Sequence, residues 1–119
     1  MRTPRIVAFG LLAAVVFAVP PVQARVGNAA RGRTLAVEAC SACHKVTRDQ
    51  AAPAPVHNAD TLEEVTAPSF FEIARKYRAR TRSLRAFIVT PEHPMREQRF
   101  LRRDLDDIVA YIRARGTAK

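Results

Sequence analysis

Hydrophobic residues recur along much of the chain with the spacing of short amphipathic helices. Ser69 and Glu72 have the spacing of a capping box, which predicts a helix that begins at Phe70. Another apolar pattern stops just before Pro91, because the residue that precedes a proline is disfavoured in a helix. The pattern predicts three to four helices, within residues 29–39, 70–77, 82–89 and 104–115.

Residues 45–67 lack this periodicity. They contain Pro53, Pro55, Asn58 and scattered acidic residues, which are typical of a loop. No stretch of the chain alternates apolar and polar residues for long enough to predict a sheet. The fold class that we predict is therefore all-α.

The first 24 residues have the order of a secretory signal peptide. Arg2 and Arg5 precede an apolar run over residues 6–19, and Val22-Gln23-Ala24 supplies a cleavage site. As a helix this run rises about 21 Å, which is less than the roughly 30 Å of a bilayer core. We predict cleavage after Ala24 and a mature domain over residues 25–119, with an uncleaved N-terminal anchor as the alternative.

Length and composition limit the protein to one small domain. The chain has 119 residues, of which 48% are apolar and 26% charged, and such a composition is typical of a folded protein. The formal net charge is +9 for the whole chain, and +7 once the two arginines of the leader are removed.

The chemistry of the chain is concentrated in Cys40-Ser41-Ala42-Cys43-His44. Two thiols at this spacing add to the two vinyl groups of a porphyrin, and the histidine that follows binds the iron. Such attachment takes place after export, so the leader and the motif support each other.

Three other interpretations of the motif are weaker. A redox-active dithiol needs a preceding strand, and no β-branched run precedes Cys40. A zinc site needs further ligands, for which only His57 and His93 are available. A disulfide between Cys40 and Cys43 is geometrically awkward.

The sixth iron ligand has one main candidate. Met95 is the single methionine outside the leader, lies 51 residues after His44 and is preceded by Pro91 and Pro94. Prolines at these positions prevent a helix and favour an extended loop. His93 is the rival ligand, and an open position is the third alternative. A thioether ligand raises the reduction potential relative to two histidines.

These residues resemble the small class I monohaem cytochromes c, over nearly all of the mature chain. Gly32 lies eight residues before Cys40, and the resemblance implies that it contacts Tyr111 of the last helix. It also implies that the carbonyl of Pro68 accepts the Nδ1 proton of His44 and so fixes the ring. The alternative is that Pro68 only begins a helix.

The resemblance implies a cytochrome c fold wrapped around one covalent haem c. The expected function is periplasmic, one-electron Fe(II)/Fe(III) transfer without enzymatic activity, by a haem that His44 and Met95 ligate. The alternatives are a haem subunit of a larger dehydrogenase or oxidase, and a haem protein with an open sixth site that acts as a peroxidase or binds a gas. The candidates for the haem lining, for each of which a core position is the favoured alternative, are Phe70, Phe71, Phe87, Ile88 and Leu105.

Six of the basic residues gather in one short stretch. They predict either a solvated helix face or a docking surface for an acidic patch on a redox partner. An anionic membrane surface is a further alternative, whereas an exported protein rarely meets nucleic acid. The six residues are Arg75, Lys76, Arg78, Arg80, Arg82 and Arg85.

Overall fold

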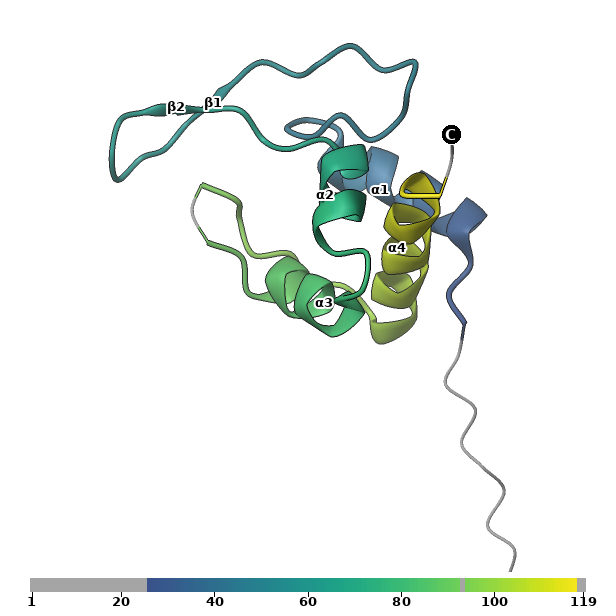
Figure 1. The fold of residues 1–119 in the computed structure, drawn as a ribbon. Coiled ribbons are helices and arrows are strands. Elements are labelled where there is room, and N and C mark those ends of the chain that lie inside the picture. Colours follow the sequence, from purple (N-terminus) through teal and green to yellow (C-terminus); the bar gives the residue numbers. More distant parts are fainter. Residues whose placement is uncertain (1–25, 93, 118–119) are drawn as a thin grey trace, which may run out of the picture.

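The computed structural model describes residues 26–92 and 94–117, and within them the chain forms four helices and one pair of very short strands (Figure 1). None of the helices in this part of the chain is long and apolar enough to cross a membrane. The predicted leader and its cleavage site lie outside the described residues. The helices are α1 (Ala29–Cys40), α2 (Phe70–Lys76), α3 (Thr81–Val89) and α4 (Arg102–Arg115).

Helices α2 and α4 begin in different ways. The start of α2 is capped by side chains, whereas the start of α4 depends on backbone hydrogen bonds. The predicted capping box of α2 is present, because Ser69 N donates to Glu72 Oε2 at 2.7 Å and Glu72 N donates to Ser69 Oγ at 3.3 Å. Helix α4 begins at Arg102, two residues before the predicted start. No side chain caps it, but the extended Leu101 accepts backbone hydrogen bonds from Asp104 N and Leu105 N at 2.9 and 3.0 Å.

The segment predicted as a loop over residues 45–67 contains a small antiparallel hairpin. Strands β1 (Val56–His57) and β2 (Glu64–Val65) pair with Val56 opposite Val65. Between them, Asn58 Oδ1 accepts a hydrogen bond from Asp60 N at 2.9 Å. Strands of two residues are too short to leave a detectable alternation in the sequence, so the prediction of no strand was wrong here.

Helices α1 and α4 cross in direct backbone contact (Figure 1). A β-carbon on Gly32 would lie 1.9 Å from the carbonyl oxygen of Asp107 and 3.0 Å from the nitrogen of Ile108. The nearest neighbour of Gly32 is therefore the α4 backbone, and the implied contact with the Tyr111 side chain stays a prediction. Tyr111 lies one turn further along α4, where its ring packs against Phe70 with the centroids 6.1 Å apart.

A second set of contacts at this crossing is ionic. The side chain of Asp107 is fully buried, accepts a hydrogen bond from Asn28 N at 2.7 Å and pairs with Arg31. Arg31 also pairs with Asp104 at 2.5 Å. Hydrogen bonding to Asp104, and then to Asp107, raises the pKa of Arg31. The two helices are thus joined by charged groups as well as by close packing.

One apolar core lies between α1, α2, α3 and α4. Three of the candidates for the haem lining, Phe70, Ile88 and Leu105, are buried in this core. Phe71 is half-buried and Phe87 is 37% exposed, so these two remain at the surface. The core residues are Ala36, Val46, Phe70, Ala74, Leu84, Ile88, Leu105, Ile108, Val109, Tyr111 and Ile112.

Candidate functional site

The two cysteines lie where α1 ends. Cys40 is the last residue of the helix, and its carbonyl accepts hydrogen bonds from Cys43 N at 3.2 Å and His44 N at 2.9 Å. Both thiols are free, with Cys43 exposed and Cys40 partly buried. Burial, and then the neighbouring Cys43, raise the pKa of Cys40 to about 11, so its thiol is neutral at physiological pH.

The imidazole of His44 is held at one of its two nitrogens. Nδ1 lies 2.7 Å from the carbonyl oxygen of Pro68, and the ring meets Phe70 edge to face with the centroids 5.9 Å apart. In the neutral imidazole, a ring that donates its Nδ1 proton to a carbonyl has no proton on Nε2. This arrangement suits binding of a metal ion through Nε2.

The position of the Pro68 carbonyl depends on the start of α2. Pro68 directly precedes Ser69, whose capping box begins the helix. The N–H of Phe70, the first residue of α2, donates to the carbonyl of Lys45 at 3.0 Å. These contacts bring the start of α2 against the segment that carries His44, although 24 residues separate His44 from Pro68.

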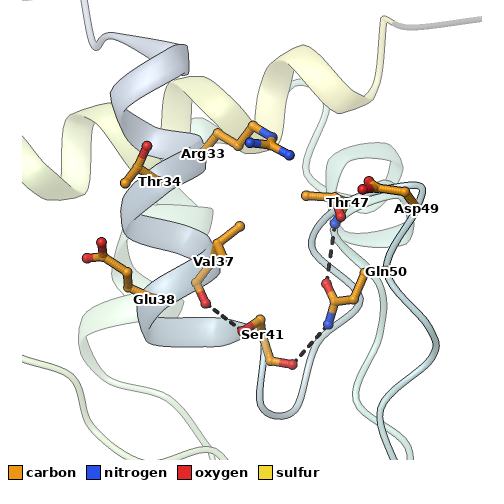
Figure 2. A pocket seen from close by; sticks show the side chains of 8 residues that line it. All are labelled: Arg33, Thr34, Val37, Glu38, Ser41, Thr47, Asp49 and Gln50. Atoms are coloured by element: carbon orange, nitrogen blue, oxygen red, sulfur yellow. Dashed lines mark hydrogen bonds between the residues drawn. The ribbon is translucent and has the colours of Figure 1, made fainter.

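A residue that we did not predict from the sequence also contacts this segment. The side-chain amide of Gln50 donates to the carbonyls of Ser41 and His44, each at 3.0 Å. Figure 2 shows Gln50 between Ser41 and Thr47, beside a groove of about 450 Å³. In the sequence Gln50 is a polar residue in a loop without periodicity, so no local signal marks it.

Met95 lies in the segment that joins α3 to α4. Its side chain is half-buried, and Met95 N donates to Glu92 O at 3.2 Å, which forms a turn. In Figure 1 the segment after α3 and the hairpin loop both project to the left of α2. The rival ligand His93 lies outside the described residues.

The described residues fit a haem better than a bare metal ion. They contain no cluster of three or more His, Cys, Asp or Glu side chains that is arranged to hold a metal. The zinc candidate His57 is exposed on β1, and its closest carboxylate is that of Glu64 at 3.7 Å. A histidine beside two free thiols instead matches what an iron porphyrin needs.

Exposed apolar side chains agree with this conclusion. Val89 and Leu101 are 39% and 61% exposed. A large apolar group bound against such residues removes their surface from water, which stabilises the folded state. The structure therefore has donor atoms that suit a haem, together with exposed apolar side chains at the end of α3 and just before α4.

The basic stretch runs along α2 and α3. Arg85 pairs with Asp106 of α4, so its charge is partly balanced by a contact inside the fold. Tyr77 and Phe87 lie among these residues with their ring centroids 6.4 Å apart, and Lys76 Nζ is 5.5 Å from the ring centroid of Tyr77. The other exposed basic side chains of the stretch are Arg75, Arg78, Arg80 and Arg82.

Comparison with known proteins identifies the family. The family model described as Cytochrome c matches residues 29–115, which include all four helices and the Cys40–His44 motif. No curated protein and no solved structure matches the chain. The chain thus belongs to the cytochrome c family, with covalently attached haem c as its cofactor and haem-based electron transfer as its chemistry.

Proposed function

We propose that the protein is a periplasmic electron carrier in which Cys40 and Cys43 attach the haem and His44 and Met95 are its axial ligands. When bound, the haem supplies one-electron cycling between Fe(II) and Fe(III). The observation that carries the proposal is the 2.7 Å contact between His44 Nδ1 and Pro68 O, which leaves Nε2 available to the iron.

The protein's own residues orient the donor atoms in this proposal. The Pro68 carbonyl holds the Nδ1 proton of His44, which fixes the ring and makes Nε2 a more basic donor. The edge-to-face contact with Phe70 restricts rotation of the same ring. Rigid orientation of a ligand favours electron transfer, because little rearrangement accompanies the change of oxidation state.

Met95 is proposed as the second axial ligand because of its place in the chain. It lies in a turn between α3 and α4 and directly follows Pro94. A thioether stabilises the reduced iron, and an iron with both axial positions filled has no site for a substrate. These properties favour a carrier over a peroxidase or a gas-binding protein.

Periplasmic location rests on the leader and on the haem motif together. The chain begins with the charge and hydropathy order of a signal peptide. Covalent attachment of a haem to Cys40 and Cys43 takes place after export, so the motif also favours a location outside the cytoplasm. We propose that residues 1–24 are removed and that the domain acts outside the cytoplasm.

The proposed docking surface is the basic stretch on α2 and α3, without Arg85. Lys76 Nζ lies 5.5 Å from the ring centroid of Tyr77, which in turn packs against Phe87, so apolar side chains and positive charge occur together. Long-range attraction to an acidic patch on a redox partner raises the encounter rate while the complex stays weak. An anionic membrane surface would attract the same charges.

Absorption spectra of the purified, haem-loaded protein, with and without carbon monoxide, test this function. We expect the charge-transfer band of a methionine-bound ferric haem and no binding of carbon monoxide by the ferrous form. Met95→Ala removes the band and admits carbon monoxide, whereas the matched variant His93→Ala retains the wild-type spectra. Carbon monoxide binding by the wild type would indicate an open sixth position and contradict the carrier.

A further inference from the structure

Every hydrogen-bonding group of the Gln50 amide is used by the segment around His44. Oε1 accepts from Val46 N at 2.7 Å and, at a longer 3.4 Å, from Thr47 N. Nε2 donates to Ser41 O and to His44 O, each at 3.0 Å. An amide has two N–H donors, so both are satisfied by these carbonyls. One side chain therefore connects the turn before His44 with the segment after it.

The carbonyls of the two residues that follow His44 accept hydrogen bonds from α2 and α4. The carbonyl of Lys45 accepts from Phe70 N of α2, and the carbonyl of Val46 accepts from the buried hydroxyl of Tyr111 on α4, both at 3.0 Å. The carbonyl of His44 accepts from Gln50. Three consecutive carbonyls are thus fixed by three different parts of the fold, and Gln50 supplies the contact on His44 itself.

We propose that Gln50 is a positioning residue for the proximal histidine. It fixes the peptide of His44 so that Nδ1 stays on the Pro68 carbonyl and Nε2 stays available to bind the iron. This inference rests on the proposed ligation of the iron by His44. It goes beyond that proposal because it assigns the orientation of the ligand to a side chain outside the haem motif.

The surroundings of Gln50 explain why this contact matters. His44 lies beyond the end of α1, where no helix hydrogen bond continues to hold its carbonyl. The groove beside Gln50 is open to water and is lined by polar side chains that include Thr34, Ser41 and Asp49 (Figure 2). If the amide is removed, water competes for the carbonyls of Ser41 and His44, and the peptide gains freedom.

The inference is tested with two variants of the haem-loaded full chain. Gln50→Leu removes all four contacts. Gln50→Glu keeps the oxygen that accepts from Val46 and Thr47 but removes the donor to Ser41 and His44. Asn28→Ala is the matched control, because it removes the α1 cap, to which Arg31 N donates at 3.0 Å, and touches nothing between residues 41 and 50.

The primary measurement is hydrogen exchange of the His44 Nδ1 proton, followed by NMR in the reduced protein. We expect both Gln50 variants to exchange this proton about tenfold faster than the control at equal global stability, because local opening no longer requires unfolding. The midpoint potential is expected to rise in Gln50→Leu, because a weaker Nδ1 bond makes the ring a poorer donor to ferric iron. The potential of Gln50→Glu is not compared, because its carboxylate by itself favours ferric iron.

Two results would overturn the inference. One is an exchange rate in both variants, and a potential in Gln50→Leu, equal to those of Asn28→Ala, which would make Gln50 only a stabiliser of the loop. The other is a wild-type exchange rate in Gln50→Glu, which would mean that donation to His44 is not needed. If Gln50→Leu does not accumulate, Gln50→Glu carries the comparison. Failure of the proposed function is recognised separately, by carbon monoxide binding to the wild type.

Discussion

A β-carbon on Gly32 would lie 1.9 Å from the carbonyl oxygen of Asp107, so α1 and α4 meet through their backbones. Glycine is required at this crossing because any side chain would force the helices apart. The separation of α1 and α4 also affects the end of α1, where Cys40 lies. The packing of the two helices is thus directly connected to the position of the haem motif.

Gly32→Ala is expected to destabilise the haem-loaded protein by about 1–3 kcal/mol, the usual cost of overpacking, despite the better helix propensity of alanine. Denaturant unfolding measures this loss. Gly116→Ala is the control, because a β-carbon there would meet Ala74 Cβ at an ordinary 3.4 Å. Equal stability of the two variants would contradict the close crossing.

Tyr111→Phe is expected to reduce the free energy of unfolding by about 1 kcal/mol, because the buried carbonyl of Val46 loses its donor. Tyr77→Phe is the matched control, since Tyr77 is half-buried and its ring contacts do not depend on the hydroxyl. The comparison uses the same denaturant titration. A loss in the control as large as that in Tyr111→Phe would argue against this role of the hydroxyl.

The capping box of α2 predicts a dependence of stability on pH. Hydrogen bonds from the Ser69 side chain, and then from its backbone, lower the pKa of Glu72 below its usual 4.5. The ionised carboxylate therefore contributes its stability above pH 4.5, and this is lost as the pH falls through the lowered pKa. Glu72→Gln keeps an acceptor without a titrating group, so its stability should change less between about pH 6 and pH 3. If the free energy of unfolding of the wild type and of Glu72→Gln changes by the same amount between these pH values, this expectation is contradicted.

The docking proposal predicts a dependence on ionic strength. Arg78→Glu and Arg82→Glu should slow electron exchange with an acidic partner by on the order of tenfold at low salt, and the difference should shrink as salt is added. Arg113→Glu makes the same change of charge at an exposed position in the last turn of α4, and is expected to have a smaller effect. Stopped-flow kinetics measure the rates. A wild-type rate that does not change with salt would count against docking by charge.

The double variant Cys40→Ala, Cys43→Ala is expected to lose most of its helix. Without an attached haem, Val89 and Leu101 remain exposed and a core of this size is too small to compensate for chain entropy. Far-ultraviolet circular dichroism measures the helix content. A cooperative thermal transition with the wild-type helix content would contradict this prediction.

Local signals in the sequence predicted the helices well. Ser69 and Glu72 interact within one turn, so the start of α2 follows from four neighbouring residues. The early start of α4 was missed because Leu101 has no capping side chain, and its role depends on backbone geometry. The hairpin was missed because two residues on each strand are too few to show alternation.

The sequence alone identified the chemical groups, because the Cys40–His44 motif places two thiols and an imidazole within five residues. The resemblance to cytochromes c implied the Pro68 carbonyl as the partner of that imidazole, whereas the hydrogen bonds of its neighbouring peptides with Tyr111 and Gln50 were decided only by the tertiary structure. The contacts of the His44 segment with Pro68 and Tyr111 join positions that are distant along the chain, and the four bonds of Gln50 depend on the path of a loop. Such contacts arise when α1, α2 and α4 pack together, because hydrogen-bond partners across the fold leave no periodic pattern in the sequence.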